Sequence, residues 1–216
     1  MSDELVFYTH PMSRGRIIRW MLEEVGAPYR TELLGFGDSM KSPAYLAINP
    51  MGKVPAITHG DTIVTECGAI CAYLADAFPD AGLAPPHGSK MRGPYYRWLF
   101  YAAGPIEQAA SMKALNVDVP PERQAMVGYG TFEALLTGIE TALKGREFVA
   151  GDKFTAADLY LGAHLGWGMS FGTIEKRPAF ETYVARQQAR PAAQRAVKID
   201  DDLLAAAQQK QPEPAE

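Results

Sequence analysis

The apolar positions in the first part of the chain predict a strand followed by a helix. Residues 4–8 form a short, mostly apolar run, and a proline-containing segment separates them from a helix that begins near Arg14. Gly26 is placed to end this helix. The apolar residues between these limits recur at spacings of one, three and four and form one face: Ile17, Ile18, Met21, Leu22 and Val25.

The following residues, up to about position 80, predict the rest of a small α/β unit. Residues 28–34 are compatible with a second strand, and the polar segment 36–49 leaves room for only a short helix. Segments 53–57 and 62–65 predict two short antiparallel strands joined by a turn, and a helix follows from Glu66 to a stop at 78–82. The element order is therefore βαβαββα, in a domain of residues 1–82.

The pattern changes after residues 83–89, which contain two prolines and one glycine and are the expected linker. Residues 90–216 show long runs of helical periodicity, so we expect an all-helical domain there and an α/β plus all-α chain. Its clearest landmark is a capping box, with Thr155 as the cap and Asp158 three residues later. The polar tail, 208–216, is expected to fray.

Composition and charge disfavour several classes of partner. The 216 residues are 47% hydrophobic and carry a formal net charge of −4, with no unbroken cluster of Lys and Arg, so we expect no nucleic-acid partner. The N-terminus has the features of neither a signal nor a transit peptide, and no stretch approaches the roughly 18 apolar residues of a membrane helix. We therefore expect a cytoplasmic protein.

The cysteines and histidines predict neither a disulfide nor a metal site. Cys67 and Cys71 lack the C-x-x-C redox spacing and are expected to remain thiols in a reducing compartment. The four histidines lie far apart and show no ligand spacing with the cysteines, so no metal is expected. No G-x-S-x-G segment is present to indicate a serine hydrolase.

The dipeptide Val54-Pro55 places a proline at the start of a predicted strand. A cis proline there would turn the amide and carbonyl of Val54 outward, where they could pair with an extended, peptide-like ligand. The alternative is an edge-strand proline that only discourages aggregation. The residues alone leave both readings open.

Four segments, in this order and spacing, resemble a soluble bacterial glutathione S-transferase: FYTHPMSRGRIIRWMLEEVG, NPMGKVPAI, TECGAICAYLAD and GDKFTAADLYLG. The likeness covers nearly the whole chain except the tail. It implies a thioredoxin-like N-terminal domain, a helical C-terminal domain and a cis proline. It also implies a homodimer that uses glutathione as co-substrate, with no other cofactor.

The resemblance assigns a set of residues to glutathione. Val54, before Pro55, would pair with the cysteinyl backbone of the tripeptide, and Lys53 would meet its glycyl carboxylate. Glu66 and Cys67 begin a helix, where free amides attract the γ-glutamyl carboxylate, with Glu66 near the ammonium group. The family usually has serine where this chain has Cys67, and a thiol is a weaker donor. Cys67 could also be only a buried helix-start residue beside Cys71.

The thiol of glutathione needs a donor that stabilises its thiolate. Ser13, between the first strand and the first helix, is the first candidate for this catalytic role, although a plain N-cap would also explain a serine there. Tyr8 is the rival donor, and Thr9 and His10 are further candidates. No cysteine occupies this loop, which argues against disulfide exchange through a protein thiolate.

The predicted activity is transfer of the glutathione thiolate to a small hydrophobic electrophile. Two alternatives remain from the sequence. One is a non-catalytic glutathione-binding or interaction module on the same scaffold, because fold does not fix function. The other is a glutathione-dependent peroxidase or reductase that uses the same thiolate.

Overall fold

The computed structural model describes residues 3–209, and these residues form two compact units. Residues 3–81 and 190–209 belong to the first unit, and residues 82–189 form the second. Fraying was predicted for residues 208–216; of these, 210–216 lie outside the described residues, and Gln208 and Gln209 belong to the last helix. No helix within 3–209 combines the length and apolar character needed to cross a membrane.

The first unit has the predicted order βαβαββα. Its elements are β1 (Leu5–Thr9), α1 (Gly15–Val25), β2 (Arg30–Leu33), α2 (Pro43–Leu46), β3 (Ala56–His59), β4 (Thr62–Thr65) and α3 (Cys67–Ala77). Short 3-10 turns, η1 (Ser39–Lys41) and η2 (Pro79–Ala81), precede α2 and follow α3. Gly26 ends α1 in the left-handed region, at φ 73°, as predicted.

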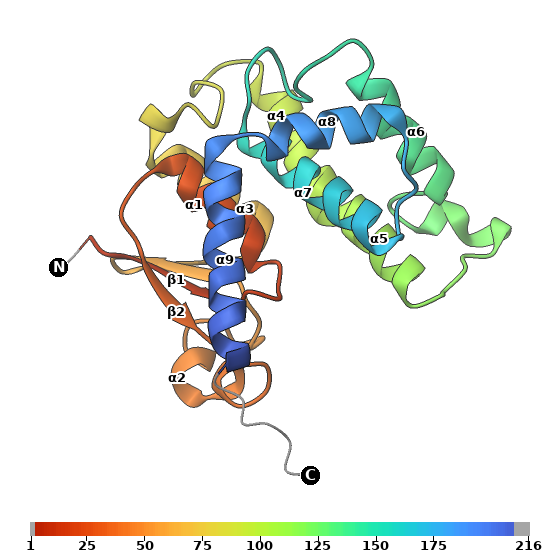
Figure 1. The fold of residues 1–216 in the computed structure, drawn as a ribbon. Coiled ribbons are helices and arrows are strands. Elements are labelled where there is room, and N and C mark those ends of the chain that lie inside the picture. The colour runs from red at the N-terminus through yellow and green to blue at the C-terminus, as the bar shows by residue number, and fades with distance from the viewer. Residues whose placement is uncertain (1–2, 210–216) are drawn as a thin grey trace. The chain divides into compact units, whose positions relative to one another are not determined.

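The four strands form one mixed sheet in the order β2-β1-β3-β4 (Figure 1). Strand β1 is parallel to β2 and antiparallel to β3, and β3 is antiparallel to β4. Phe7 and Ile57 are opposite each other and are fully buried. The next pair, Tyr8 and Ala56, lies on the other face, where Tyr45 of α2 packs against it. The alternation of period two thus assigns Phe7 and Tyr8 to opposite faces.

Helix α9 (Pro191–Gln209) also belongs to the first unit and packs along α1 (Figure 1). This arrangement differs from the division made from the sequence, which placed all of residues 90–216 in the helical domain. Helical periodicity identifies an apolar face but not the element that covers it. The buried residues of α9 are three alanines and Asp200, and Asp200 forms a fully buried ion pair with Arg19 of α1 at 3.2 Å.

The second unit is all-helical, as predicted, with no strand between residues 82 and 189. Its helices are α4 (Arg92–Tyr101), α5 (Glu107–Ala114), α6 (Phe132–Leu143), α7 (Ala156–Phe171) and α8 (Pro178–Gln188). A π-helical turn, η3 (Ala102–Ile106), contains Pro105 and joins α4 to α5, and a 3-10 segment, η4 (Pro121–Met126), precedes α6.

The predicted capping box is present at the start of α7. One carboxylate oxygen of Asp158 accepts hydrogen bonds from the N–H and the hydroxyl of Thr155, both at 2.9 Å. The other oxygen accepts from the Val149 N–H at 2.7 Å and from the Tyr183 hydroxyl at 2.9 Å. Asp158 therefore joins the preceding loop, the start of α7 and α8 through one buried side chain.

Candidate functional site

The strand register brings the first three of the four sequence segments quoted above to one edge of the sheet. Tyr8, near the end of β1, is opposite Ala56 at the start of β3, and Ala56 is opposite Thr65 at the end of β4. The loop after β1, the residues before β3 and the start of α3 must therefore meet there. A hydrogen bond supports this, because the Cys67 thiol donates to the Arg14 carbonyl at 3.8 Å.

The Val54–Pro55 peptide bond is cis, as expected. Val54 is half-buried and lies two residues before β3, outside the strand ladder. The carbonyl of the preceding residue, Lys53, accepts two hydrogen bonds, from the Tyr45 hydroxyl at 2.6 Å and from Asn49 Nδ2 at 2.8 Å. Two buried side chains, Tyr45 and Asn49, therefore hold the backbone that leads into Val54.

Sequence reasoning did not assign a role to Tyr45 or Asn49. Burial raises the pKa of Tyr45 to about 12, so its hydroxyl remains a donor throughout the physiological range. Asn49 also accepts the Met51 N–H at 3.1 Å. Its place at the start of NPMGKVPAI was an available signal, whereas nothing in the sequence distinguishes Tyr45 from an ordinary core aromatic.

Two lysines lie at the segment before β3: Lys53 belongs to it, and Lys41, the last residue of η1, contacts it. The side chain of Lys53 is exposed. Lys41, which lies in no motif of the sequence, donates through Nζ to the carbonyls of Met51 and Gly52 at 2.9 and 3.1 Å. Gly52 has φ 59°, and a Cβ there would lie 2.6 Å from the Met40 carbonyl oxygen, so this close approach requires glycine.

The start of α3 carries an unusual backbone conformation. Glu66, the N-cap, is exposed and has φ 71° and ψ 125°, a region that residues other than glycine rarely adopt. Such conformations carry about 1–3 kcal/mol of strain and are concentrated at functional sites. Cys67, the first residue of α3, is buried, and burial raises the pKa of Cys71 one turn later. Neither Cys67 nor Cys71 forms a disulfide.

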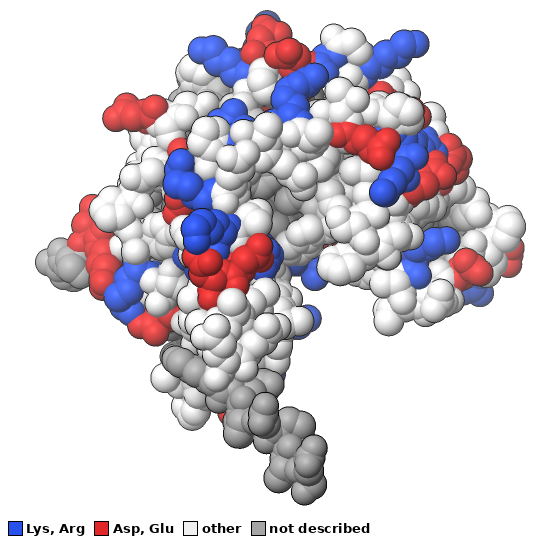
Figure 2. Space-filling view, viewed as in Figure 1, with Lys and Arg blue, Asp and Glu red and all other residues white. Residues whose placement is uncertain are grey.

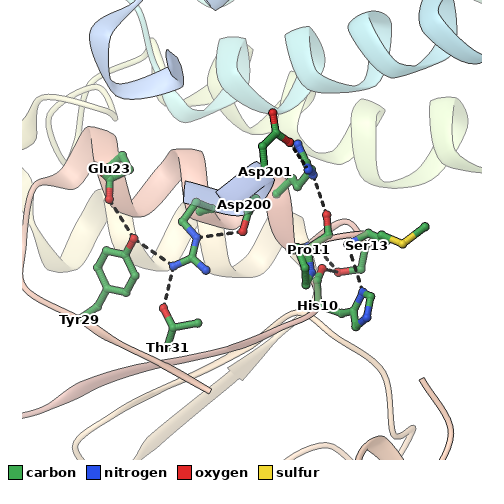
Figure 3. Close-up of polar contacts among 12 residues, drawn as sticks. His10, Pro11, Ser13, Glu23, Tyr29, Thr31, Asp200 and Asp201 are labelled. Atoms are coloured by element: carbon green, nitrogen blue, oxygen red, sulfur yellow. Dashed lines mark hydrogen bonds and ion pairs between the residues drawn. The ribbon is translucent and has the colours of Figure 1, made fainter. Parts of the chain in front are cut away.

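Ser13 lies in the loop between β1 and α1. Its hydroxyl donates to the His10 carbonyl at 2.6 Å and accepts the Gly15 N–H at 3.0 Å (Figure 3). The N-cap position itself is Arg14, one residue later than the sequence alternative placed it, but Ser13 still satisfies the first helical amide. Ser13 is half-buried.

The other candidate donors differ in their surroundings. Tyr8 is half-buried, and its ring lies 5.7 Å from that of Tyr45. Thr9 is fully buried, with its hydroxyl packed so closely on Gly15 that a Cβ at position 15 would lie 1.9 Å from it. His10 Nδ1 accepts the Met12 N–H at 3.1 Å, and partial burial lowers the pKa of His10. Nδ1 is therefore unprotonated, and the neutral ring carries its proton on Nε2.

The titratable side chains within residues 3–209 form no group of three or more His, Cys, Asp or Glu that could hold a metal ion. At the edge of the sheet the polar groups are backbone amides, hydroxyls, lysines and the exposed Glu66 carboxylate. These groups suit a peptide-like anion with carboxylates at its ends.

A thioredoxin-like sheet with such an edge, followed by a helical unit, defines a class of two-domain proteins, and comparison with known proteins identifies the family. Residues 4–76 match the glutathione S-transferase N-terminal domain, and residues 105–191 match the glutathione S-transferase C-terminal domain. The chain therefore belongs to the glutathione S-transferase family, and it is an enzyme of that family.

Individual relatives agree with this assignment. Glutathione S-transferase GstA of Escherichia coli O157:H7 is 33% identical over 158 residues, which are 72% of this chain and 78% of the relative. A glutathione transferase structure from Methylococcus capsulatus str. Bath superimposes with a TM-score of 0.76 at 30% identity, covering 91% of this chain and 98% of that one. A sphingomonad glutathione S-transferase, complexed with glutathione, has a TM-score of 0.72 at 28% identity, with 91% and 98% covered.

Proposed function

We propose that this enzyme binds glutathione at the edge of the sheet formed by the ends of β1 and β4 and the start of β3, ionises its thiol, and conjugates it to a small hydrophobic electrophile. The observation that carries the proposal is the register that aligns Tyr8, Ala56 and Thr65. This register supports a single site for the Ser13 loop, Val54 and Glu66, which are far apart in the sequence.

Each part of glutathione has a matching group in this arrangement. The amide and carbonyl of Val54 would pair with the cysteinyl backbone, on a segment fixed through the Lys53 carbonyl. The N-terminus of the eleven-residue helix α3 would receive the γ-glutamyl carboxylate, with the Glu66 carboxylate beside the ammonium group. This placement gives a reason for the strained backbone of Glu66. Lys53 is the candidate for the glycyl carboxylate.

The chemical step requires a thiolate. A free thiol has a pKa of about 8.5, so only a few per cent is ionised at neutral pH. The Ser13 hydroxyl would turn from the His10 carbonyl and donate to the sulfur, while its oxygen keeps the Gly15 N–H. The thiolate then forms a carbon–sulfur bond with the electrophile, which releases its leaving group or accepts a proton.

An ultraviolet difference titration of the protein with glutathione across pH tests the proposal. We expect saturable binding and a bound thiol that ionises at least one pH unit below its free value. Glu66→Gln should weaken binding about tenfold without removing the shift in thiol pKa. Binding without any shift would instead favour the non-catalytic scaffold.

The reaction class requires product analysis. With an aromatic or alkyl halide as electrophile, conjugation gives a thioether and releases halide. A peroxidase or disulfide reductase gives oxidised glutathione and no thioether. A homodimer and a cytoplasmic location, where glutathione is the main thiol buffer, complete the proposal, and the oligomeric state can be measured by sedimentation.

A further inference from the structure

Arg16, in the first turn of α1, connects the candidate catalytic loop to the last helix. Its Nε donates to the Pro11 carbonyl at 2.6 Å, and its Nη2 donates to Asp201 of α9, also at 2.6 Å (Figure 3). Pro11 lies between His10 and Ser13, and both ends of that turn are hydrogen-bonded to each other. One guanidinium therefore touches both the turn that presents Ser13 and a helix more than 180 residues away in sequence.

Helix α9 is a firm anchor for this contact. Next to Asp201, Asp200 is buried and paired with Arg19 of α1 at 3.2 Å. Arg19 also donates to the Tyr29 hydroxyl at 3.1 Å and to the Thr31 hydroxyl at 2.7 Å, which ties the same pair to β2 (Figure 3). Acidic and basic side chains are mixed on the face that includes α9 (Figure 2). Because Arg19 of α1 holds Asp200, the adjacent Asp201 is also held in place against α1.

We propose that Arg16 is a positioning residue for thiol activation: held by Asp201, it holds the Pro11 carbonyl and so fixes the loop that aims the Ser13 hydroxyl at the glutathione sulfur. The inference rests on the proposed function. A loop free to move by about 1 Å loses much of an oriented hydrogen bond. In this role Arg16 contacts Pro11 and Asp201 and does not contact the substrate.

Simple electrostatics and positioning predict opposite results for Asp201→Asn. Removal of a carboxylate increases the positive potential near the loop, which by charge alone would lower the pKa of the bound thiol. If Asp201 acts through the geometry of Arg16, the same change loosens the loop, weakens the hydrogen bond to the thiolate and raises that pKa. The direction of the shift separates the two explanations.

The chain supplies a matched control. Arg195 of α9 pairs with Glu23 of α1 at 3.0 Å, so Arg195→Gln also removes an ion pair between these helices without touching the loop. The side chains of Arg195 and Asp201 are similarly exposed, at 55% and 58%. A purely structural contribution of α9 packing should therefore affect both variants alike.

The experiment measures thiol ionisation, kcat and KM for glutathione in the wild type, Asp201→Asn, Arg16→Met and Arg195→Gln. We expect Asp201→Asn to raise the pKa of the bound thiol by about half a unit and to lower kcat about threefold, with KM nearly unchanged. Arg16→Met should have the larger effect, about tenfold in kcat, and Arg16→Lys should restore part of it. Arg195→Gln should resemble the wild type.

The outcomes distinguish this inference from the proposed function. If the wild type itself shows no lowered thiol pKa, the proposed thiolate chemistry fails. If the wild type shows it and Asp201→Asn leaves it unchanged or lowers it further, the positioning role is refuted. Equal losses in Asp201→Asn and Arg195→Gln would also refute it, because they would indicate a general effect of α9 packing.

Discussion

At the scale of single residues, Ser13 has two hydrogen bonds that do not involve a ligand, so its structural and catalytic roles must be separated. Ser13→Ala removes the donor to His10 and the acceptor for Gly15. We expect kcat to fall by about ten- to a thousandfold while glutathione affinity changes little, because the lost hydrogen bond is made mainly to the thiolate. Steady-state kinetics with a halide electrophile measures this.

Tyr8→Phe is the control for that prediction. Tyr8 packs against the buried cluster of Met40, Tyr45 and Ala56. Removing its hydroxyl should therefore leave turnover within about twofold of the wild type. The opposite result, an inactive Tyr8→Phe with an active Ser13→Ala, would transfer the donor role to Tyr8.

Tyr45 gives a second residue-level prediction. Tyr45→Phe removes one of the two donors to the Lys53 carbonyl and leaves Asn49 as the other. We expect a loss of about 1–2 kcal/mol in the free energy of unfolding and a several-fold rise in KM for glutathione, with kcat preserved. A rise in KM without a fall in kcat would distinguish this substitution from Ser13→Ala. An unchanged KM would show that the hydrogen bond from Tyr45 to the Lys53 carbonyl does not position Val54.

The sequence suggested candidate residues within short motifs but not the residues that contact those motifs from elsewhere. Val54, Glu66 and Ser13 are candidates because proline, a helix start and a loop hydroxyl each carry a local chemical signal. The positive φ of Glu66 had no such signal, since glutamate does not favour it. The contacts of Tyr45 with the Lys53 carbonyl, and of Arg16 with Pro11 and Asp201, exist only in the folded chain.

At the scale of elements, the start of α7 depends on a single carboxylate. Asp158→Ala leaves the Val149 N–H, the Thr155 N–H and the Tyr183 hydroxyl without this acceptor. We expect a loss of about 3–5 kcal/mol in the free energy of unfolding, measured with urea. Thr155→Ala, which removes only a cap hydroxyl, should cost about 1 kcal/mol. Equal losses in the two variants would show that the additional acceptor contacts contribute nothing.

Sequence periodicity predicted the strands and helices of residues 1–82 individually, and for the rest of the chain it predicted only long helical runs and a capping box. It assigned α9 to the helical domain because that domain precedes α9 in the chain. Helix α9 buries only small apolar residues, Ala192, Ala193 and Ala196, together with Asp200, which pairs with Arg19 of α1, so its buried face lacks the large apolar side chains by which a core helix is recognised. An element held by a buried ion pair is thus harder to place from sequence than one held by an apolar face.

At the scale of the whole molecule, burial makes several acidic groups retain their protons in the folded state. The pKa is raised, chiefly by burial, for Tyr29, Tyr45, Cys71, Tyr101 and Tyr183. At a pH above their ordinary values, the unfolded chain binds fewer protons than the folded one, so stability falls as pH rises. For Tyr45 this window extends from about 10 to about 12.

Urea unfolding between pH 8 and pH 11 checks this expectation. The free energy of unfolding should decline increasingly above pH 9, and Tyr45→Phe should decline less steeply than the wild type because it lacks one of these groups. A pH-independent wild type, or equal slopes in the two proteins, would contradict the assignment of raised pKa values to these buried groups.

The membership of α9 in the first unit also bears on how the chain is made. In chain order the helical unit stands between two pieces of the first unit, as an inserted domain does. A ribosome adds about 5–20 residues per second, so the sheet and α1 emerge many seconds before Asp200 can reach Arg19. During that interval the buried guanidinium has no carboxylate from α9, and the first unit is completed only after the second has been synthesised.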